Sequence, residues 1–151
     1  MATTTFQGIV RSNGGAGKGN STPSVVTLSE VISFDPTAAA ATNVRIGTSS
    51  SSGETFVLPA GAVPVSFMTI GGATGGTNPT VDIGPSADDD GFFNEVDADT
   101  KGTLKGADGA LVVAGGTTAI STVTGKVGAS AATGGTITGV FTYTVVDSGA
   151  E

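Results

Sequence analysis

The sequence predicts an all-β fold, either an antiparallel β-sandwich or a jelly-roll-like barrel, with an extended N-terminal arm. Its 25 glycines argue against long helices, because each glycine inside a helix costs about 1 kcal/mol relative to alanine. Threonine and valine are abundant, and both favour strands. Roughly seven to nine short strand-like segments alternate with glycine-rich turns, a pattern typical of sandwiches and barrels.

The 151 residues fit one domain, which we divide into an arm, residues 1–22, and a β-sandwich domain, residues 23–151. The most regular part of the domain is residues 54–146. The arm carries a short apolar patch followed by a stretch too rich in glycine to form a regular element. Because this patch is separated from the domain, we predict that Phe6, Ile9, Val10 and Arg11 contact a partner.

The first predicted strand, residues 24–34, places Val26, Leu28, Ile32 and Phe34 on one face, interrupted by Glu30. A short strand is expected at residues 43–46. Two further strands, residues 54–58 and 62–70, flank a Pro-Ala-Gly turn.

In the strand at residues 62–70, Val63, Val65 and Phe67 are expected to share a face at period two. Pro64 lies within this strand and has no N–H to donate. It therefore predicts a sheet edge or a β-bulge at this point.

The second half of the chain begins with a strand at residues 80–84, where Val81 and Ile83 face inward and Asp82 faces outward. Residues 85–91 form a loop, and residues 92–99 form a single helical turn or an irregular segment. Strands are expected at residues 110–113 and 118–127.

The clearest strand covers residues 136–146. It places Ile137, Phe141, Tyr143 and Val145 on one face and threonines on the other.

The chain contains neither histidine nor cysteine. This excludes imidazole acid–base catalysis, thiolate nucleophiles, disulfides and zinc–thiolate sites. Paired carboxylates for glycoside hydrolysis could come from Asp82, Asp88, Glu95 or Asp97, but such sites commonly use aromatic platforms and the chain has no tryptophan. We therefore expect no enzymatic activity.

Two motifs partly resemble known ligand-binding loops, one for phosphate and one for calcium, but neither matches its consensus fully. The run Gly14-Gly-Ala-Gly-Lys-Gly19 has Ser12 where a phosphate-binding loop needs glycine, and Gly19 where it needs Ser or Thr. An acidic turn over residues 86–97 imitates the spacing of a calcium loop, but a solvated turn is the stronger interpretation. No cofactor or metal is expected. The residues in the calcium-like spacing are Ser86, Asp88, Asp90, Gly91 and Asp97.

The net charge is −7, and it is unevenly distributed along the chain. Residues 1–50 hold three basic and two acidic residues, whereas residues 51–151 hold three basic and eleven acidic ones. This balance disfavours direct binding of nucleic acid. No secretory signal and no apolar run of about 20 residues is visible, so we expect no membrane association.

Residues 56–64, residues 80–92 and residues 134–143 together resemble small virion structural proteins of tailed phages, of the cyanophage or other marine phage type. The opening residues 5–12 are similar to the start of some members. The resemblance implies a β-sandwich capsid decoration (cement) protein that binds the outside of the lattice of the phage major capsid protein and stabilises the DNA-filled head. It also implies a homo-oligomer, a trimer, located on the exterior of the virion capsid and in the host cytoplasm during assembly.

Two alternatives stay open at this stage. The first is another virion component, a tail or fibre structural subunit. The second is an extracellular carbohydrate-binding or adhesin module, which the scarcity of aromatic residues and the lack of a visible signal disfavour.

Overall fold

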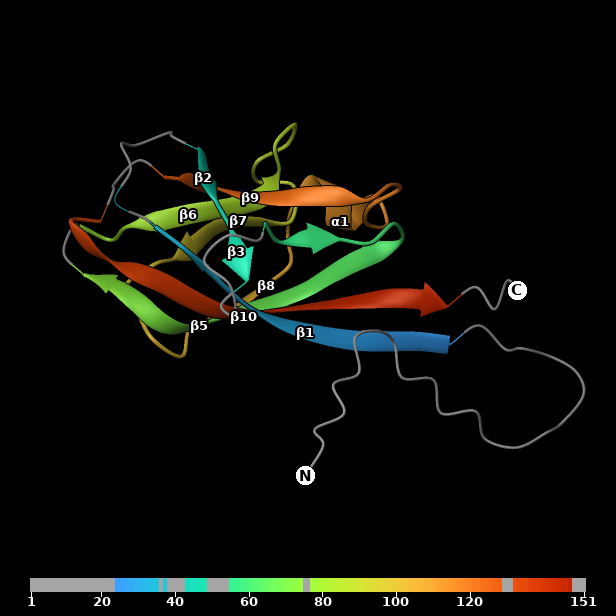
Figure 1. The fold of residues 1–151 in the computed structure, drawn as a ribbon, viewed down its shortest axis with the longest axis horizontal. Coiled ribbons are helices and arrows are strands. Elements are labelled where there is room, and N and C mark those ends of the chain that lie inside the picture. Colours follow the sequence, from blue (N-terminus) through green and yellow to red (C-terminus); the bar gives the residue numbers. More distant parts are fainter. Residues whose placement is uncertain are drawn as a thin grey trace, which may run out of the picture.

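The computed structural model describes residues 24–35, 37, 43–48, 55–74, 77–128 and 132–147. These residues form two antiparallel β-sheets packed face to face as an open sandwich (Figure 1). The all-β prediction is confirmed, and the sheets do not close into a barrel. Among the described residues, no helix is long and apolar enough to cross a membrane.

We call the sheet that contains the two longest strands sheet I and the other sheet II. In spatial order, sheet I consists of β3 (Gly47–Thr48), β1 (Ser24–Phe34), β10 (Gly134–Asp147), β5 (Ala62–Thr74) and β8 (Leu104–Gly106). Sheet II consists of β2 (Asn43–Arg45), β9 (Ser121–Val127), β6 (Thr80–Pro85) and β7 (Phe93–Asp97), with β4 (Val57–Leu58) also paired to β9. One short helix, α1 (Ala110–Val113), follows β8.

The pairing of β1 with β10 is the most regular part of the fold. It runs without a break from Ser24 opposite Asp147 to Phe34 opposite Ile137. The start of β1 and the end of β10 therefore lie side by side, and in Figure 1 they project beyond the other strands at the right. The period-two pattern of both segments predicted correctly that they form strands.

Strand β5 is irregular because its register against β10 shifts by one residue next to Val65 and again next to Ile70. The first shift follows Pro64, so of the two alternatives predicted at this proline, a sheet edge or a β-bulge, the structure has the β-bulge. The expectation that Val63, Val65 and Phe67 share a face is wrong. The bulge inserts one residue and reverses the alternation, so that Phe67 is fully buried while Val65 is exposed.

The core is built around the ring of Phe141 on β10. This ring packs against Phe56, Phe93 and Tyr143 with centroid distances of 5.1, 5.3 and 6.2 Å. Six of the seven phenylalanines are buried in one cluster: Phe34, Phe56, Phe67, Phe92, Phe93 and Phe141. Aromatic rings from both sheets, such as Phe141 and Phe93, therefore meet in the core alongside its aliphatic side chains.

A glycine makes room for this ring cluster. Any Cβ added to Gly139 on β10 would overlap the ring of Phe67 on the neighbouring strand β5. Gly139 lies opposite Thr69, two residues along β5 from Phe67, and its missing side chain leaves room for the Phe67 ring.

Residues 110–113, predicted as a strand, form the helical turn α1, which corrects that expectation. A four-residue apolar run has no periodicity that separates a strand from a helix. The local geometry decides: the N–H of Leu111 donates to Gly91 O at 3.0 Å, and Gly115 and Gly116 end the turn with φ of 97° and 92°. Positive φ values of this size favour glycine.

Residues 92–99, expected as a helical turn or an irregular segment, contain strand β7, so that expectation is also wrong. Its pairing with β6 skips from Val96 to Phe93, which leaves Asn94 and Glu95 opposite the single residue Asp82. This bulge disrupts the alternation that identifies a strand in a sequence. The predicted arm, residues 1–22 with Phe6, Ile9, Val10 and Arg11, lies outside the described residues.

Candidate interaction surface

The register of sheet I brings four apolar residues into one line across four strands. Val31 on β1 lies opposite Val140 on β10, Val140 lies opposite Met68 on β5, and Met68 lies opposite Leu104 on β8. Residues directly opposite each other in a sheet share a face. We call this line the apolar band. Val31, Met68 and Leu104 are 37%, 36% and 65% exposed, so the band lies on the outer face of the sandwich.

The two bulges of β5 place further apolar side chains at the surface. Val65 and Ile70, the residues at the two register shifts, are 44% and 43% exposed. Each lies within three positions of Met68 along the same strand. The bulges therefore enlarge the exposed apolar surface around the apolar band.

A parallel line of small hydroxyl side chains runs beside the apolar band. Ser29, Thr142 and Ser66 lie opposite one another on β1, β10 and β5, and the line ends at Gly106 on β8. The Oγ of Ser29 and the Oγ1 of Thr142 are hydrogen-bonded at 3.1 Å. We call this line the hydroxyl band.

The outer face of sheet I is uncharged in the part of the chain with described side chains. Two charged residues in its strands, Glu30 and Lys105, lie opposite the core residues Phe141 and Phe67, so they belong to the inner side of the sheet. An uncharged face with exposed apolar side chains can be buried by a partner without removing any charge from water. This is the property of a protein interaction surface.

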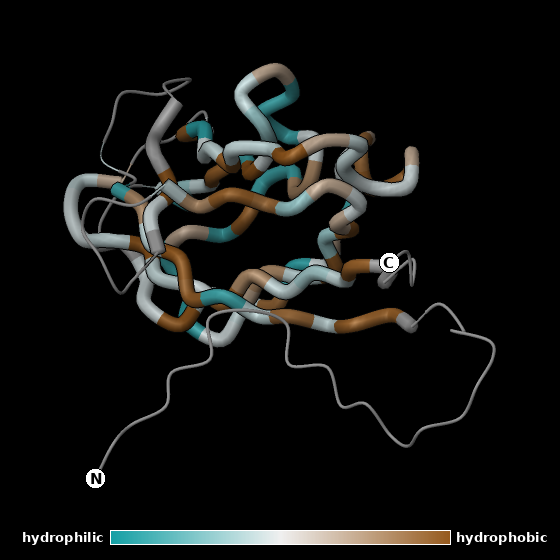
Figure 2. The backbone as a smooth tube through the Cα atoms, turned by 45° about the vertical axis from the view of Figure 1, so that its right-hand side comes forward, coloured by the Kyte–Doolittle hydropathy of each residue, from teal (hydrophilic) through white to brown (hydrophobic). Residues whose placement is uncertain are grey.

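Sheet II has the opposite character. Asp82 on β6 lies opposite Lys126 on β9. Lys126 Nζ forms an ion pair at 2.6 Å with Oδ2 of Asp89, which is in the loop after β6. The loop at residues 85–91 protrudes at the top of Figure 1, and its acidic run is part of the teal, hydrophilic stretch just below the tip of this loop in Figure 2. Most of the acidic residues of the second half of the chain are thus on or near this sheet.

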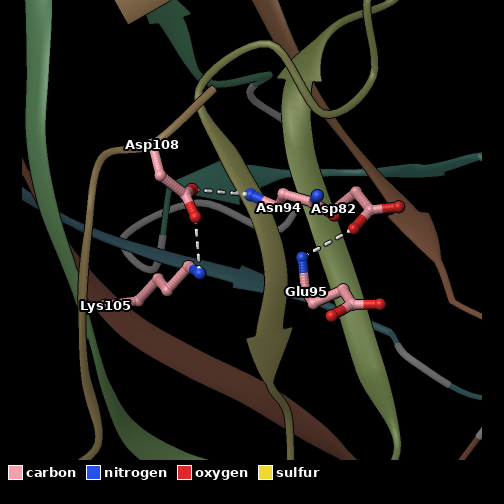
Figure 3. A network of polar contacts seen from close by, with 5 residues as sticks. All are labelled: Asp82, Asn94, Glu95, Lys105 and Asp108. Carbon is pink, nitrogen blue, oxygen red and sulfur yellow. Dashed lines mark hydrogen bonds and ion pairs between the residues drawn. The ribbon is translucent and has the colours of Figure 1, made fainter. Parts of the chain in front are cut away.

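The carboxylates at the edge of sheet II hold the β7 bulge in place (Figure 3). Glu95 has a φ of 53°, and its N–H donates to Asp82 Oδ1 at 2.8 Å. The N–H of Asn94 donates to Asp108 Oδ1 at 3.1 Å, and Asp108 also pairs with Lys105 at 2.7 Å. The two bulge amides therefore donate to carboxylates in place of the sheet carbonyls that the bulge removes.

This arrangement sets the pKa of Asp108. Partial burial raises the pKa, but the hydrogen bond and charge of Lys105 and the Asn94 N–H lower it more, so the net pKa lies below its usual value. The carboxylate of Asp108 is thus favoured in its charged form by the contacts that link β7 to β8.

The acidic turn has no cation-binding geometry in the described residues. Asp97, the last ligand in the calcium-like spacing, accepts hydrogen bonds from the N–H groups of Asp99 and Thr100 at 2.9 and 3.0 Å. No three acidic residues of the described part converge on a point that could hold a metal ion. Desolvation and the neighbouring Asp90 raise the pKa of Asp88.

No protein-family model and no curated protein matches the sequence. Two solved structures have a similar fold. A chain of the cyanophage Pam1 capsid asymmetric unit is 16% identical, with 89% of this chain and 93% of that chain covered at a TM-score of 0.53. A chain of the capsid of Ralstonia phage GP4 is 21% identical, with 81% and 84% covered at a TM-score of 0.50. At these identities the likeness concerns the fold.

Proposed function

We propose that this protein is a capsid decoration (cement) protein of a tailed phage. It binds the outside of the major capsid protein lattice and stabilises the DNA-filled head. The observation that carries this proposal is the fold shared with chains from two phage capsids over most of the length of both partners. Near-equal coverage of both chains means that the capsid chains it resembles are of similar size, which supports a small separate subunit.

The outer face of sheet I is the surface we assign to docking on the capsid. The apolar band and the exposed Val65 and Ile70 offer apolar area, and burial of apolar area is worth roughly 25 cal/mol per Å². The hydroxyl band flanks them with side chains that can donate and accept hydrogen bonds. The acidic sheet II would then face solvent.

The role is mechanical and needs no catalytic group. Each docked subunit adds contacts that must break before the shell opens, so the bound protein opposes the outward pressure of packaged DNA. We further propose that the partner is the major capsid protein, that the location is the virion exterior after assembly in the host cytoplasm, and that three copies form a closed ring, a common outcome for homo-oligomers.

Mass spectrometry of purified particles tests the assignment. We expect an abundance comparable to that of the major capsid protein. A few copies per particle would favour a tail or fibre subunit, and absence from particles would contradict any virion role and favour the adhesin alternative.

Heating particles that lack the protein tests the stabilising role separately. Such particles should release DNA at a lower temperature than complete ones. Adding back the purified protein should restore the release temperature, and identical release curves with and without the protein would contradict stabilisation.

A further inference from the structure

The two edges of sheet I are protected very differently. On the β5 side, the N–H of Ala107 donates to Val65 O at 3.0 Å, the N–H of Thr69 to Thr103 O at 3.1 Å, and the N–H of Thr117 to Ala62 O at 2.9 Å. Residues 102–107 and Thr117 therefore cover this edge along most of its length. Backbone groups that would otherwise be open are used within the domain.

On the β1 side, the described part of the chain leaves most of the edge without a paired strand. Strand β3 pairs with β1 only at Ile32 and Ser33. Within the described residues, no other strand pairs with residues 24–31 on the side away from β10. Eight consecutive residues thus present a row of backbone donors and acceptors at the sheet edge.

This open edge lacks the usual protection against strand pairing. Natural proteins block such edges with prolines, bulges, charges or short strands. Strand β1 has no proline, pairs with β10 without a bulge over its whole length, and has Glu30 as its single charged residue. The edge is therefore long, regular and almost neutral.

We infer that the β1 edge, residues 24–31, is an acceptor site for an added β-strand, and that the strand is residues 3–10 of a second copy of this chain. The sequence Thr3-Thr-Thr-Phe-Gln-Gly-Ile-Val10 has the same length as the open edge and contains neither charge nor proline. Threonine, phenylalanine, isoleucine and valine are strand-favouring residues. Strand addition to an exposed edge is a common mode of peptide recognition, in which main-chain hydrogen bonds supply the affinity.

The chain between the two segments is long enough to reach a neighbour. Residues 11–23 number thirteen and can span up to roughly 45 Å when extended. The start of β1 is also at the projecting end of sheet I (Figure 1).

Exchange of this kind closes either as a reciprocal dimer, in which each of two copies donates its segment to the other, or as a head-to-tail ring of more copies. Head-to-tail contacts close into rings when the rotation between copies permits. The proposal therefore gives a physical basis for a closed oligomer that does not depend on any capsid. It stands apart from the proposed function, because it concerns only copies of this chain in solution.

Cysteine cross-linking of the full chain tests the proposal, and the absence of natural cysteine makes the background clean. One preparation carries Gln7→Cys and an isotopically heavy second preparation carries Thr27→Cys, an exposed position on β1. Equal amounts are mixed in concentrated solution and treated with a flexible thiol cross-linker. We expect mixed light–heavy dimers joined through residues 7 and 27 to be the main product.

The matched control replaces Thr27→Cys by Thr122→Cys, an exposed strand position on sheet II. Equal cross-linking to both positions, or none to residue 27, would overturn the proposal. A third preparation carries Gln7→Cys and Thr27→Cys in the same chain. If residues 7 and 27 join only in this preparation, the occupant of the edge is the chain's own arm and the second-copy proposal is wrong.

Deletion of residues 2–12 provides an independent readout. Light scattering should show loss of the oligomer, while circular dichroism shows the same β-sheet content as the full chain. Ser29→Cys serves as a second edge position in case Thr27→Cys fails to fold. An oligomer of unchanged size after the deletion would contradict strand exchange.

Discussion

The two outer faces of the sandwich cover the same core but differ in polarity: the face of sheet II carries charged side chains, and the face of sheet I carries apolar ones. On sheet II, Asp82 accepts a hydrogen bond from the backbone of the β7 bulge, so its charge serves the domain's own structure. On sheet I, the apolar band of Val31, Val140, Met68 and Leu104 is exposed and contributes little to the core. The difference indicates which face is organised for the domain itself and which is available to a partner.

The largest expected effect comes from charging the apolar band. The double variant Met68→Lys with Leu104→Glu places an ion pair across β5 and β8, so the free domain should fold normally. Burying these charges against the capsid is costly, and we expect binding to emptied capsids to weaken roughly a hundredfold, about 2.7 kcal/mol. A sedimentation binding assay measures this.

The control for that variant is Thr122→Glu on sheet II, which should bind as tightly as the unmodified protein. If instead the sheet II variant loses affinity and the apolar-band variant does not, the assignment of the two faces is reversed.

The next effect concerns the core that both faces share. In Gly139→Ala, the new methyl group overlaps the ring of Phe67. Overpacking of this kind should lower the free energy of unfolding by about 1–3 kcal/mol, measured by urea denaturation. Gly106→Ala is the matched control, since nothing lies within 4 Å of an added Cβ there. Equal stability of the two variants would show that β5 shifts freely to accommodate the methyl group.

A smaller effect on stability is expected when single polar side chains are removed, and it should differ between the two faces. Asp82→Ala removes the acceptor for the Glu95 N–H and should lower the free energy of unfolding by about 1 kcal/mol, whereas Asp82→Asn, which keeps an acceptor oxygen, should retain most of it. Thr142→Ala removes the exposed hydrogen bond to Ser29 and should cost about 0.5 kcal/mol or less. A larger loss for Thr142→Ala would mean that the hydroxyl band is structural.

The smallest effect is the pH dependence of stability. The pKa of Asp108 is lowered in the folded state, so its stabilising contribution is fully present above its unfolded pKa and is lost as pH falls through the folded value, from about pH 4 downward. The raised pKa of Asp88 acts in the opposite direction. Urea denaturation of Asp108→Asn across this range should show a weaker loss on acidification, and an unchanged profile would contradict the assignment.

The regular strands of this fold were predictable from the sequence, whereas the bulged ones were not. Residues 24–34 and 136–146 show a period-two pattern over most of their length, and both form strands with the expected faces. In β5 and β7 an extra residue breaks the alternation, and this led to the wrong face for Val65 and the wrong element at residues 92–99. Local pattern cannot reveal a bulge that depends on the neighbouring strand, although Pro64 did signal one.

The candidate interaction surface could not be predicted from the sequence for a related reason. Val31, Met68, Leu104 and Val140 lie far apart in the sequence, and each is an ordinary apolar residue in its own segment. They become a surface only once the register of four strands is known. The predicted contact residues Phe6, Ile9, Val10 and Arg11 stay a prediction, because they lie outside the described residues.

The pairing of Ser24 with Asp147 also bears on how the chain could be reconnected. Paired residues in antiparallel strands have Cα atoms about 4.5–5.5 Å apart, so a short glycine linker could join these two positions directly. New ends could be opened at the exposed turn around Lys101 and Gly102. A circular permutant made in this way keeps every strand pair of both sheets while removing residues 1–23 and 148–151. It therefore separates the folding of the sandwich from any contribution of these two terminal segments.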